Sequence, residues 1–437
     1  MRSFASTSVI AAVVGLSTTG LLKANAQISG QHVYSDGDGS REQTHVDYHI
    51  DDDATCGVLV DNHTRLQLQQ STISRVNFTG KNNLSADGII GNAVVCALDG
   101  ADLLADHDYI EFHNDHAAGV WTSGFNTTTH LSNVRVTSMG ANTWGMVASN
   151  HSTVVASNIE MESNQNSSCG FVAVGGSLSV DYSVVYADGR FSAGFCIETA
   201  DPPSGMVHAR GVTSSSLEGV AVWLYGAAGQ ISFTNCTLVG GGGAAIISAS
   251  LPRGLAQPHD LNIIDSVVTA TNPNSPVLYY AVTDSNTHIY NSTLNAAGPD
   301  LIVSKCGSTA FVKCTAFFTN ISISESEVEG TIQAWAPSRL RYELTSYSRW
   351  TGSVVNTPSD VASSAPDVYL DETSVWTVNK DTWVRALVSS LGNVSNIVAA
   401  EPNITIRYDS GAVENAYLLS QAFEIEGGGS VQPYLAK

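Results

Sequence analysis

The sequence predicts an all-β fold in which successive turns of chain stack into a parallel β-solenoid of about eleven rungs. One observation is a heptad that recurs with spacings of 26, 25, 24 and 25 residues. Its copies are GVWTSGF, GMVASNH, GFVAVGG, GFCIETA and GVAVWLY, beginning at Gly119, Gly145, Gly170, Gly194 and Gly219. The other is strand character, because the heptads and the second stretches that follow them, such as LSNVRVTS and DYSVVYAD, alternate apolar with polar residues. Stacked copies of such a unit can share one core.

Later repeats keep the apolar strand but lose the glycine. They read AIISASL from Ala245, PVLYYAV from Pro276 and DLIVSKC from Asp300. From about Cys56 to Trp350 this pattern resembles a right-handed parallel β-helix of the pectin-lyase-like type, on the basis of period and strand character. The resemblance implies a single-stranded, right-handed solenoid. A β-propeller fits less well, because its blades run about 40 to 45 residues.

The two ends of the chain differ from the repeats. Residues 1–26 have Arg2, an apolar run from Val9 to Leu16 and a small-residue ending, which predicts a secretory signal peptide. Residues 27–350 then form the β-helix with its amino-terminal cap, 351–366 a linker, and 367–437 a small β-rich extension of extra rungs and a cap. No later segment is long enough to span a membrane, so we expect a secreted protein.

One phrase in the carboxyl-terminal part carries a second resemblance. It is similar to an L-D-x-x-S-x-W-T-V phrase that recurs near the end of secreted adhesin-like and autotransporter-like β-helical proteins. The matching residues are Leu370, Asp371, Ser374, Trp376, Thr377 and Val378. A plainer explanation is one or two further rungs and a cap, which would cover the open end of the solenoid.

The glycosylation motifs and cysteines agree with secretion. Sequons occur at Asn62, Asn77, Asn83, Asn126, Asn150, Asn166, Asn235, Asn291, Asn320, Asn393 and Asn403, and we expect part of them to be used. Seven cysteines follow the signal peptide, so some should pair and at least one should not pair within the chain. Cys306 and Cys314 could close a short loop, whereas the other connectivity stays open.

Charge excludes one class of partner. The formal net charge is 19 − 40 = −21, and loss of Arg2 and Lys23 with the signal peptide takes it to 17 − 40 = −23. Nucleic acid is therefore not expected as a partner, because its binding depends on Lys and Arg at phosphates. An acidic polymer such as pectate would need a bridging divalent cation, and calcium is the possible cofactor; otherwise none is expected.

The first strand of each repeat predicts a binding surface. The residue after each heptad glycine is large and apolar and should point inward, so the alternate positions point outward. These outward positions are rich in apolar and aromatic residues, which usually marks a binding surface or a second covering layer. The candidate ligand-binding residues are Trp121, Phe125, His151, Trp223, Tyr225 and Tyr280.

Glu198 is the candidate catalytic residue. Aligning the heptad glycines places it outward between Val174 and Trp223, where the tryptophan could desolvate the acid. A glycoside hydrolase needs two carboxyl groups flanking one bond, and no second acid occupies this column. A lyase would need Arg or Lys nearby, and the outward strands carry only His151 as a basic residue. A solvated surface glutamate therefore remains the plainer interpretation.

Two histidine-rich segments are weak metal candidates. In THVDYHIDDD, alternation puts His45, Asp47 and His49 on one face of a strand, a pattern that can chelate a divalent ion. In DHDYIEFHNDH, His107, Tyr109, Glu111 and His113 share a face. A wet polar strand face explains both segments equally simply, and the metal hypothesis would gain if they met in space.

Three functions remain open. The first is a secreted, glycosylated β-helix that binds a glycan or other extracellular ligand along its aromatic outward strip. The second is a carbohydrate-active lyase or hydrolase on a neutral or calcium-bridged polysaccharide, with Glu198 as acid or base, which rests mainly on fold analogy. The third is an isomerase or cyclase that acts on a small hydrophobic molecule in the secretory route.

Overall fold

A computed structural model describes residues 30–35, 39–51, 56–76, 92–199, 205–226, 229–249, 258–305, 316–335, 338–355 and 365–434. The predicted signal peptide and the cysteines Cys306 and Cys314 lie outside these residues. The fold is an all-β parallel solenoid of about 13 turns with almost no helix, which confirms the predicted fold class. The chain forms two compact units: unit 1 is Met1–Ile231 with Cys236–Gly242, and unit 2 is Ser232–Asn235 with Gly243–Lys437.

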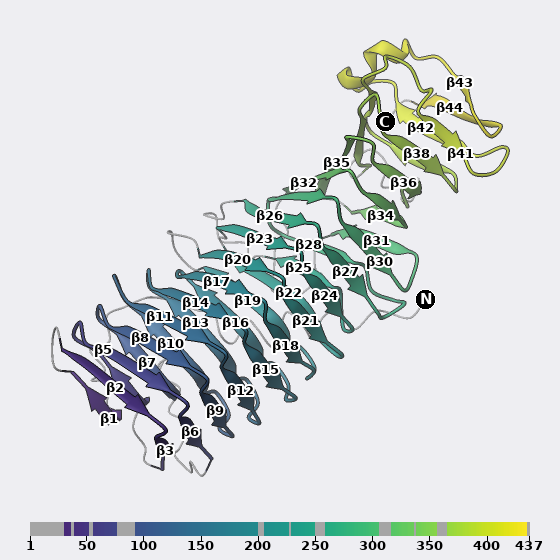
Figure 1. Cartoon of the computed structure of the whole chain (residues 1–437). Coiled ribbons are helices and arrows are strands. Elements are labelled where there is room, and N and C mark those ends of the chain that lie inside the picture. The colour runs from purple at the N-terminus through teal and green to yellow at the C-terminus, as the bar shows by residue number, and fades with distance from the viewer. Residues whose placement is uncertain are drawn as a thin grey trace. The chain divides into compact units, whose positions relative to one another are not determined.

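Each complete turn of unit 1 contributes one strand to each of three parallel sheets, here called A, B and C (Figure 1). Sheet A has β1 (Gly30–Tyr34), β4 (Cys56–Val60), β7 (Ala93–Leu98), β10 (Ala118–Ser123), β13 (Trp144–Ser149), β16 (Cys169–Val174), β19 (Ala193–Thr199) and β22 (Val220–Gly226). Sheet B has β2 (Ser40–Thr44), β5 (Arg65–Gln69), β8 (Asp102–Asp106), β11 (Thr128–Ser132), β14 (Thr153–Ser157), β17 (Ser177–Asp181) and β20 (Met206–Arg210). Sheet C has β3 (Asp47–His49), β6 (Thr72–Arg75), β9 (Tyr109–Phe112), β12 (Arg135–Ser138), β15 (Glu160–Ser163), β18 (Val184–Ala187), β21 (Thr213–Ser216) and β24 (Thr237–Gly240).

Unit 2 repeats the arrangement and ends in a small fourth sheet. Its sheet A strands are β25 (Ile246–Ala249), β28 (Leu278–Ala281), β31 (Asp300–Ser304) and β34 (Thr331–Ala334). Sheet B has β26 (His259–Ile264), β29 (Ser285–Tyr290), β32 (Phe317–Ser324), β35 (Ser338–Thr345), β37 (Asp367–Leu370) and β40 (Leu387–Ser389), and β23 (Gln230–Thr234) of this sheet has residues in both units. Sheet C has β27 (Val267–Ala270), β30 (Thr293–Ala296), β33 (Glu327–Glu329), β36 (Arg349–Gly352), β38 (Val375–Val378) and β41 (Ile397–Ala399). The fourth sheet joins β39 (Thr382–Val384), β42 (Thr405–Asp409), β44 (Gly429–Tyr434) and β43 (Phe423–Ile425), with only β43 antiparallel, and η1 (Val413–Leu418) is a 3-10 helix.

The solenoid has more turns than the repeat pattern predicts. Strands β1, β2 and β3 precede Cys56, and β37, β38, β40 and β41 continue sheets B and C beyond Trp350. The predicted count of about eleven covered only the stretch from about Cys56 to Trp350, and both of these segments lie outside it. Strand pairing depends on the apolar alternation, which both segments retain.

The heptad glycines are required by close packing inside the solenoid. A Cβ at Gly145 would collide with the Met161 sulfur, and one at Gly194 would collide with the Ser214 hydroxyl. At Gly145 and Gly194, the space between this inner corner and sheet C is therefore too narrow for a side chain. In the register of β22, Ala221 takes this place, while Gly219 lies in the preceding turn against the Ser192 carbonyl.

A column of buried serines holds the turns between sheets B and C. The backbone N–H groups of Ser266 and Ser292 donate to the hydroxyls of Ser292 and Ser326, one turn further along, at 3.0 Å each. Ser326 and Ser348 continue the column toward Ser374, with distances of 3.4 and 3.2 Å. The residue before each column serine commonly has a positive φ, as at Asp265 and Asn291, which favours Asn or Asp.

The carboxyl-terminal phrase is explained by the same turn chemistry. Asp371 accepts the backbone N–H groups of Ser346 and Ser374 at 2.6 and 2.8 Å, and Ser374 is the last column serine described above. Trp376 is fully buried and stacks on Trp350 with ring centroids 4.7 Å apart. The phrase therefore forms one more turn, β37 to β38, of the solenoid.

Candidate functional site

The outward positions of sheet A in unit 1 do not form the exposed strip that their pattern predicts. Trp121, Trp223 and Tyr225 are only 3%, 6% and 7% exposed. The predicted exposure of this strip was therefore wrong for these three residues. Alternation along a strand decides which side of the sheet a residue occupies, but it does not decide whether that side meets solvent.

The two buried tryptophans differ in their polar contacts. The indole N–H of Trp121 donates to the Ser149 hydroxyl at 2.9 Å. The indole N–H of Trp223 is buried and finds no acceptor among the described residues. Beside Trp223 in register lies Cys196, which forms a disulfide with Cys169. An unpaired buried donor is costly, so this environment favours a bound acceptor.

Glu198 has a different neighbour from the one expected. In sheet A it pairs with Val174 on one side and with Tyr225 on the other. The predicted pairing with Trp223 was wrong, because Gly219 lies in a turn and not at the inner corner, which shifts the register by two residues. The Glu198 side chain is outside the described part of the structure, so its catalytic role stays a prediction.

Tyr280 belongs to the core of unit 2. Its hydroxyl and that of Thr287 are 2.7 Å apart, and both residues are buried. Burial also raises the pKa of its phenol well above the usual value. The predicted outward position of Tyr280 was therefore wrong, because Thr287 faces inward from β29.

Phe125 and His151 are the two predicted ligand-binding residues that reach solvent. Phe125 is 69% exposed, and its ring stacks on His151 with centroids 4.1 Å apart and an interplanar angle of 15°. We call these two side chains the ring pair. They lie in the turns that follow β10 and β13. In the next turn, the Gly175 carbonyl accepts the backbone N–H of His151 at 2.8 Å. Gly175 itself has no side chain.

The turns around the ring pair are fixed by buried hydroxyls. Thr127 accepts the Gly100 N–H at 2.9 Å, and Ser152 donates to the Thr122 carbonyl at 2.8 Å. Two sequon asparagines, Asn126 and Asn150, are exposed beside the rings and have positive φ. The turns that carry the ring pair are therefore anchored to neighbouring turns, so the aromatic surface is preorganised.

The two histidine-rich segments lie on the same sheet but do not converge on a metal site. Strands β3 and β9 of sheet C are separated by β6, so His49 and Glu111 are two strands apart. The Nδ1 atom of His49 lies 2.7 Å from the Ser74 hydroxyl, and His113 Nε2 lies 2.9 Å from Glu111. His45 has a positive φ and lies in a turn. Among the residues that the structure describes, no group of three His, Cys, Asp or Glu could hold a metal.

Asp108 is a buried carboxyl group that the sequence pattern did not identify. It is 2% exposed, and its Oδ1 accepts the backbone N–H of Ser71 at 2.6 Å. Burial raises the pKa of the Asp108 carboxyl to about 6. Its place in the serine column, directly after the positive-φ residue His107, was the available signal.

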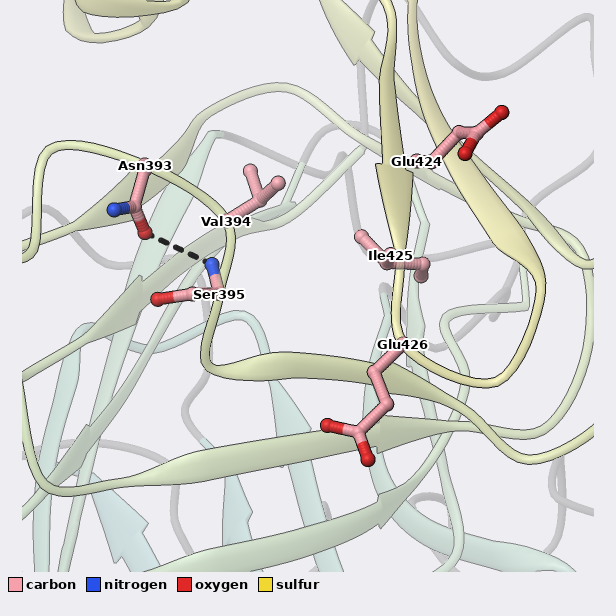
Figure 2. A pocket seen from close by; sticks show the side chains of 6 residues that line it. All are labelled: Asn393, Val394, Ser395, Glu424, Ile425 and Glu426. Atoms are coloured by element: carbon pink, nitrogen blue, oxygen red, sulfur yellow. Dashed lines mark hydrogen bonds between the residues drawn. The ribbon is translucent and has the colours of Figure 1, made fainter.

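An open hollow of about 400 Å³ lies in the carboxyl-terminal part of unit 2 (Figure 2). It is lined by Asn393, Val394, Ser395, Glu424, Ile425 and Glu426. The two glutamate side chains point in different directions in Figure 2, and Asn393 accepts the Ser395 N–H at 2.9 Å. Acid catalysis on a sugar requires two carboxyl groups that converge on one bond, and these two glutamates do not converge.

Comparison with known proteins found no match, so the function has to be argued from the geometry. No protein-family model matches the chain, and no curated protein matches it either. No described helix is long and apolar enough to cross a membrane. What the described residues establish is an all-β parallel solenoid with two disulfides and one exposed aromatic ring pair.

Proposed function

We propose that the protein is a secreted, disulfide-bonded glycoprotein that binds the pyranose rings of an extracellular glycan at the ring pair. The single observation that carries this proposal is the stacking of Phe125 on His151 in an exposed, anchored turn. Sugar rings have apolar C–H faces that pack on flat aromatic rings, and a preformed surface reduces the entropy lost on binding.

The scaffold supports this proposal. Two disulfides, Cys56–Cys96 and Cys169–Cys196, join successive turns of sheet A, and such bonds persist in oxidising compartments. We place the chain with right-handed, pectin-lyase-like β-helices, and its carboxyl-terminal phrase with those of adhesin-like proteins, as part of the same proposal. In a solenoid of stacked turns, neighbouring turns can present side chains at strand spacing to an extended ligand.

The test is direct binding to a glycan array, followed by calorimetry on any sugar that binds. Protein from a bacterial periplasm is suitable, because disulfides form there while N-linked sugar is absent. We expect Phe125→Ala to weaken binding about tenfold, equivalent to about 1.4 kcal/mol. Tyr347→Ala is the matched control, since Tyr347 is 75% exposed at another turn. Equal affinities of wild type and Phe125→Ala, or the absence of any bound sugar, would refute the proposal.

A second candidate function has one observation in its favour, the buried indole N–H of Trp223, which has no acceptor in the part of the chain that the structure describes. It fits a small hydrophobic molecule that offers a carbonyl or ether oxygen beside Val172 and the Cys169–Cys196 disulfide. A set of apolar ketones, read by tryptophan fluorescence, tests it with Trp223→Phe, which keeps the ring and removes the donor. Equal response from wild type and variant would exclude this role for Trp223.

A further inference from the structure

Two sequon asparagines flank the ring pair, and their amide groups are in different states. The Nδ2 atom of Asn150 donates to the Ser123 hydroxyl on the neighbouring turn at 3.1 Å. The carboxamide of Asn126 is exposed and makes no hydrogen bond to any residue in the described part of the chain. Asn126 directly follows Phe125 and has a φ of 58°. Of the two, Asn126 is the one whose amide makes no contact that an attached sugar would have to break.

The turn that carries Asn126 also fixes where an attached sugar would lie. The Thr127 N–H donates to the Gly124 carbonyl at 3.3 Å, and the Thr127 hydroxyl accepts the Gly100 N–H at 2.9 Å. Phe125 and Asn126 are thus exposed neighbours in one anchored turn. A sugar on Asn126 would be attached to the residue next to Phe125, whose exposed ring offers a flat surface to the apolar face of the sugar.

We infer that Asn126 carries an N-linked glycan whose first sugar stacks on the ring pair and blocks it against free glycans. The covalent step joins Asn126 Nδ2 to the anomeric carbon of the sugar. It breaks the bond from that carbon to the diphosphate of a lipid-linked oligosaccharide donor, and the amide proton leaves with the diphosphate. The inference rests on the proposed function for its blocking effect, whereas the stacking itself can be measured separately.

In this arrangement the sugar attached to Asn126 would occupy the binding site of its own protein. An attached sugar is present at a high effective concentration because its linker is one side chain long, so it outcompetes a free sugar of similar intrinsic affinity. Binding of an outside glycan would then require that the attached sugar be absent, trimmed or displaced. Occupancy of one sequon would regulate the site.

The experiment uses full-length protein secreted from a eukaryotic host. Thr128→Val removes the Asn126 sequon and leaves Phe125, Asn126 and His151 in place. Thr237→Val is the matched control, because it removes the Asn235 sequon on a different turn. Glycopeptide mass spectrometry measures occupancy at Asn126, and modification by diethyl pyrocarbonate measures access to the His151 ring, with the exposed His130 as internal reference.

We expect Asn126 to be occupied in wild type and His151 to react several-fold faster in Thr128→Val than in wild type or Thr237→Val. An unmodified Asn126, or an equal His151 rate in all three proteins, would overturn the stacking. Free-glycan binding is then compared, and Thr128→Val should bind at least about tenfold more tightly than wild type. Equal measurable affinity would overturn the blocking, whereas a Thr128→Val protein with fast His151 modification that binds no sugar would overturn the proposed function and leave the stacking standing.

Discussion

Asp108 accepts the backbone N–H of Ser71 through Oδ1 at 2.6 Å, while no described residue donates a hydrogen bond to its buried Oδ2. Serines occupy the same place in several other turns and offer the same acceptor without a charge. The carboxylate form is therefore disfavoured by burial, which raises the pKa to about 6 from a usual 3.8.

Asp108→Asn should stabilise the protein at neutral pH. Because the folded pKa lies above the unfolded one, the folded state binds more protons between these values, and stability falls as pH rises from about 4 through 6. The neutral amide of Asn keeps an acceptor for the Ser71 N–H and does not ionise. The variant therefore avoids the loss in free energy of unfolding, which is on the order of 2 to 3 kcal/mol at pH 7. Urea unfolding at about pH 4 and about pH 7 measures it. Asp106→Asn is the control, because hydrogen bonding from Asn133 lowers the pKa of that half-buried acid. A variant no more stable than wild type at neutral pH would contradict the prediction.

Removal of the Cys169–Cys196 disulfide should destabilise unit 1. The cross-link spans 27 residues, and the chain-entropy relation gives about 3.5 kcal/mol for such a loop. The double variant Cys169→Ser with Cys196→Ser avoids an unpaired thiol, and thermal unfolding with and without reductant measures the loss. Reductant should lower the melting temperature of wild type further than that of the variant, which retains only Cys56–Cys96 among the described disulfides. Identical melting of both oxidised proteins would be inconsistent with this role.

Gly145→Ala should cost about 1 to 3 kcal/mol, because the new methyl group would overlap the Met161 side chain and approach the Gly170 carbonyl at 2.7 Å. Gly243→Ala is the control, since its nearest atom would be 4.0 Å away. Shortening Met161 to Ala in the Gly145→Ala background should recover part of the loss in a double-mutant cycle. Additive losses would show that Met161 is not the source of the clash.

Arg385 should hold η1 to the last turns of unit 2. Its guanidinium donates to Asp367 at 2.6 Å and to Glu414 of η1 at 2.8 Å. The hydrogen bond to Asp367 raises the pKa of Arg385 above its ordinary value. Arg385→Met keeps much of the side-chain length and removes both ion pairs, leaving the mostly buried Asp367 without its cation. We expect faster proteolysis within 410–420, read by mass spectrometry. The control Arg349→Met loses only the exposed pair with Glu327 and should be cut like wild type.

The fold class followed from the sequence because each turn repeats the same physical demands. Apolar alternation, the inner-corner glycine and the positive-φ asparagine each leave a residue signature, and they recur at a fixed period. Gly219 shows the limit of this reasoning. Gly219 has the right spacing in the sequence, but it lies in a turn, and Ala221 occupies the inner corner. The predicted neighbour of Glu198 in β22 was therefore two residues out of register.

The candidate site was predicted less completely. Phe125 and His151 were identified as outward side chains, but their contact depends on the conformation of two turns, which period alone does not specify. Trp121 and Trp223 satisfy the same alternation and are buried. Asp108 was missed because its place in the serine column is recognised only once the strand register is known.

The two disulfides share one geometry, with Cα atoms 5.9 and 6.0 Å apart, although they join different pairs of turns. Each links the residue just before an inner corner to the residue two places after the corner of the following turn. Ala118 and Val147 hold the corresponding places around Gly119 and Gly145. The architecture thus contains ready-made positions for engineered cystines, by which consecutive turns could be locked together one at a time.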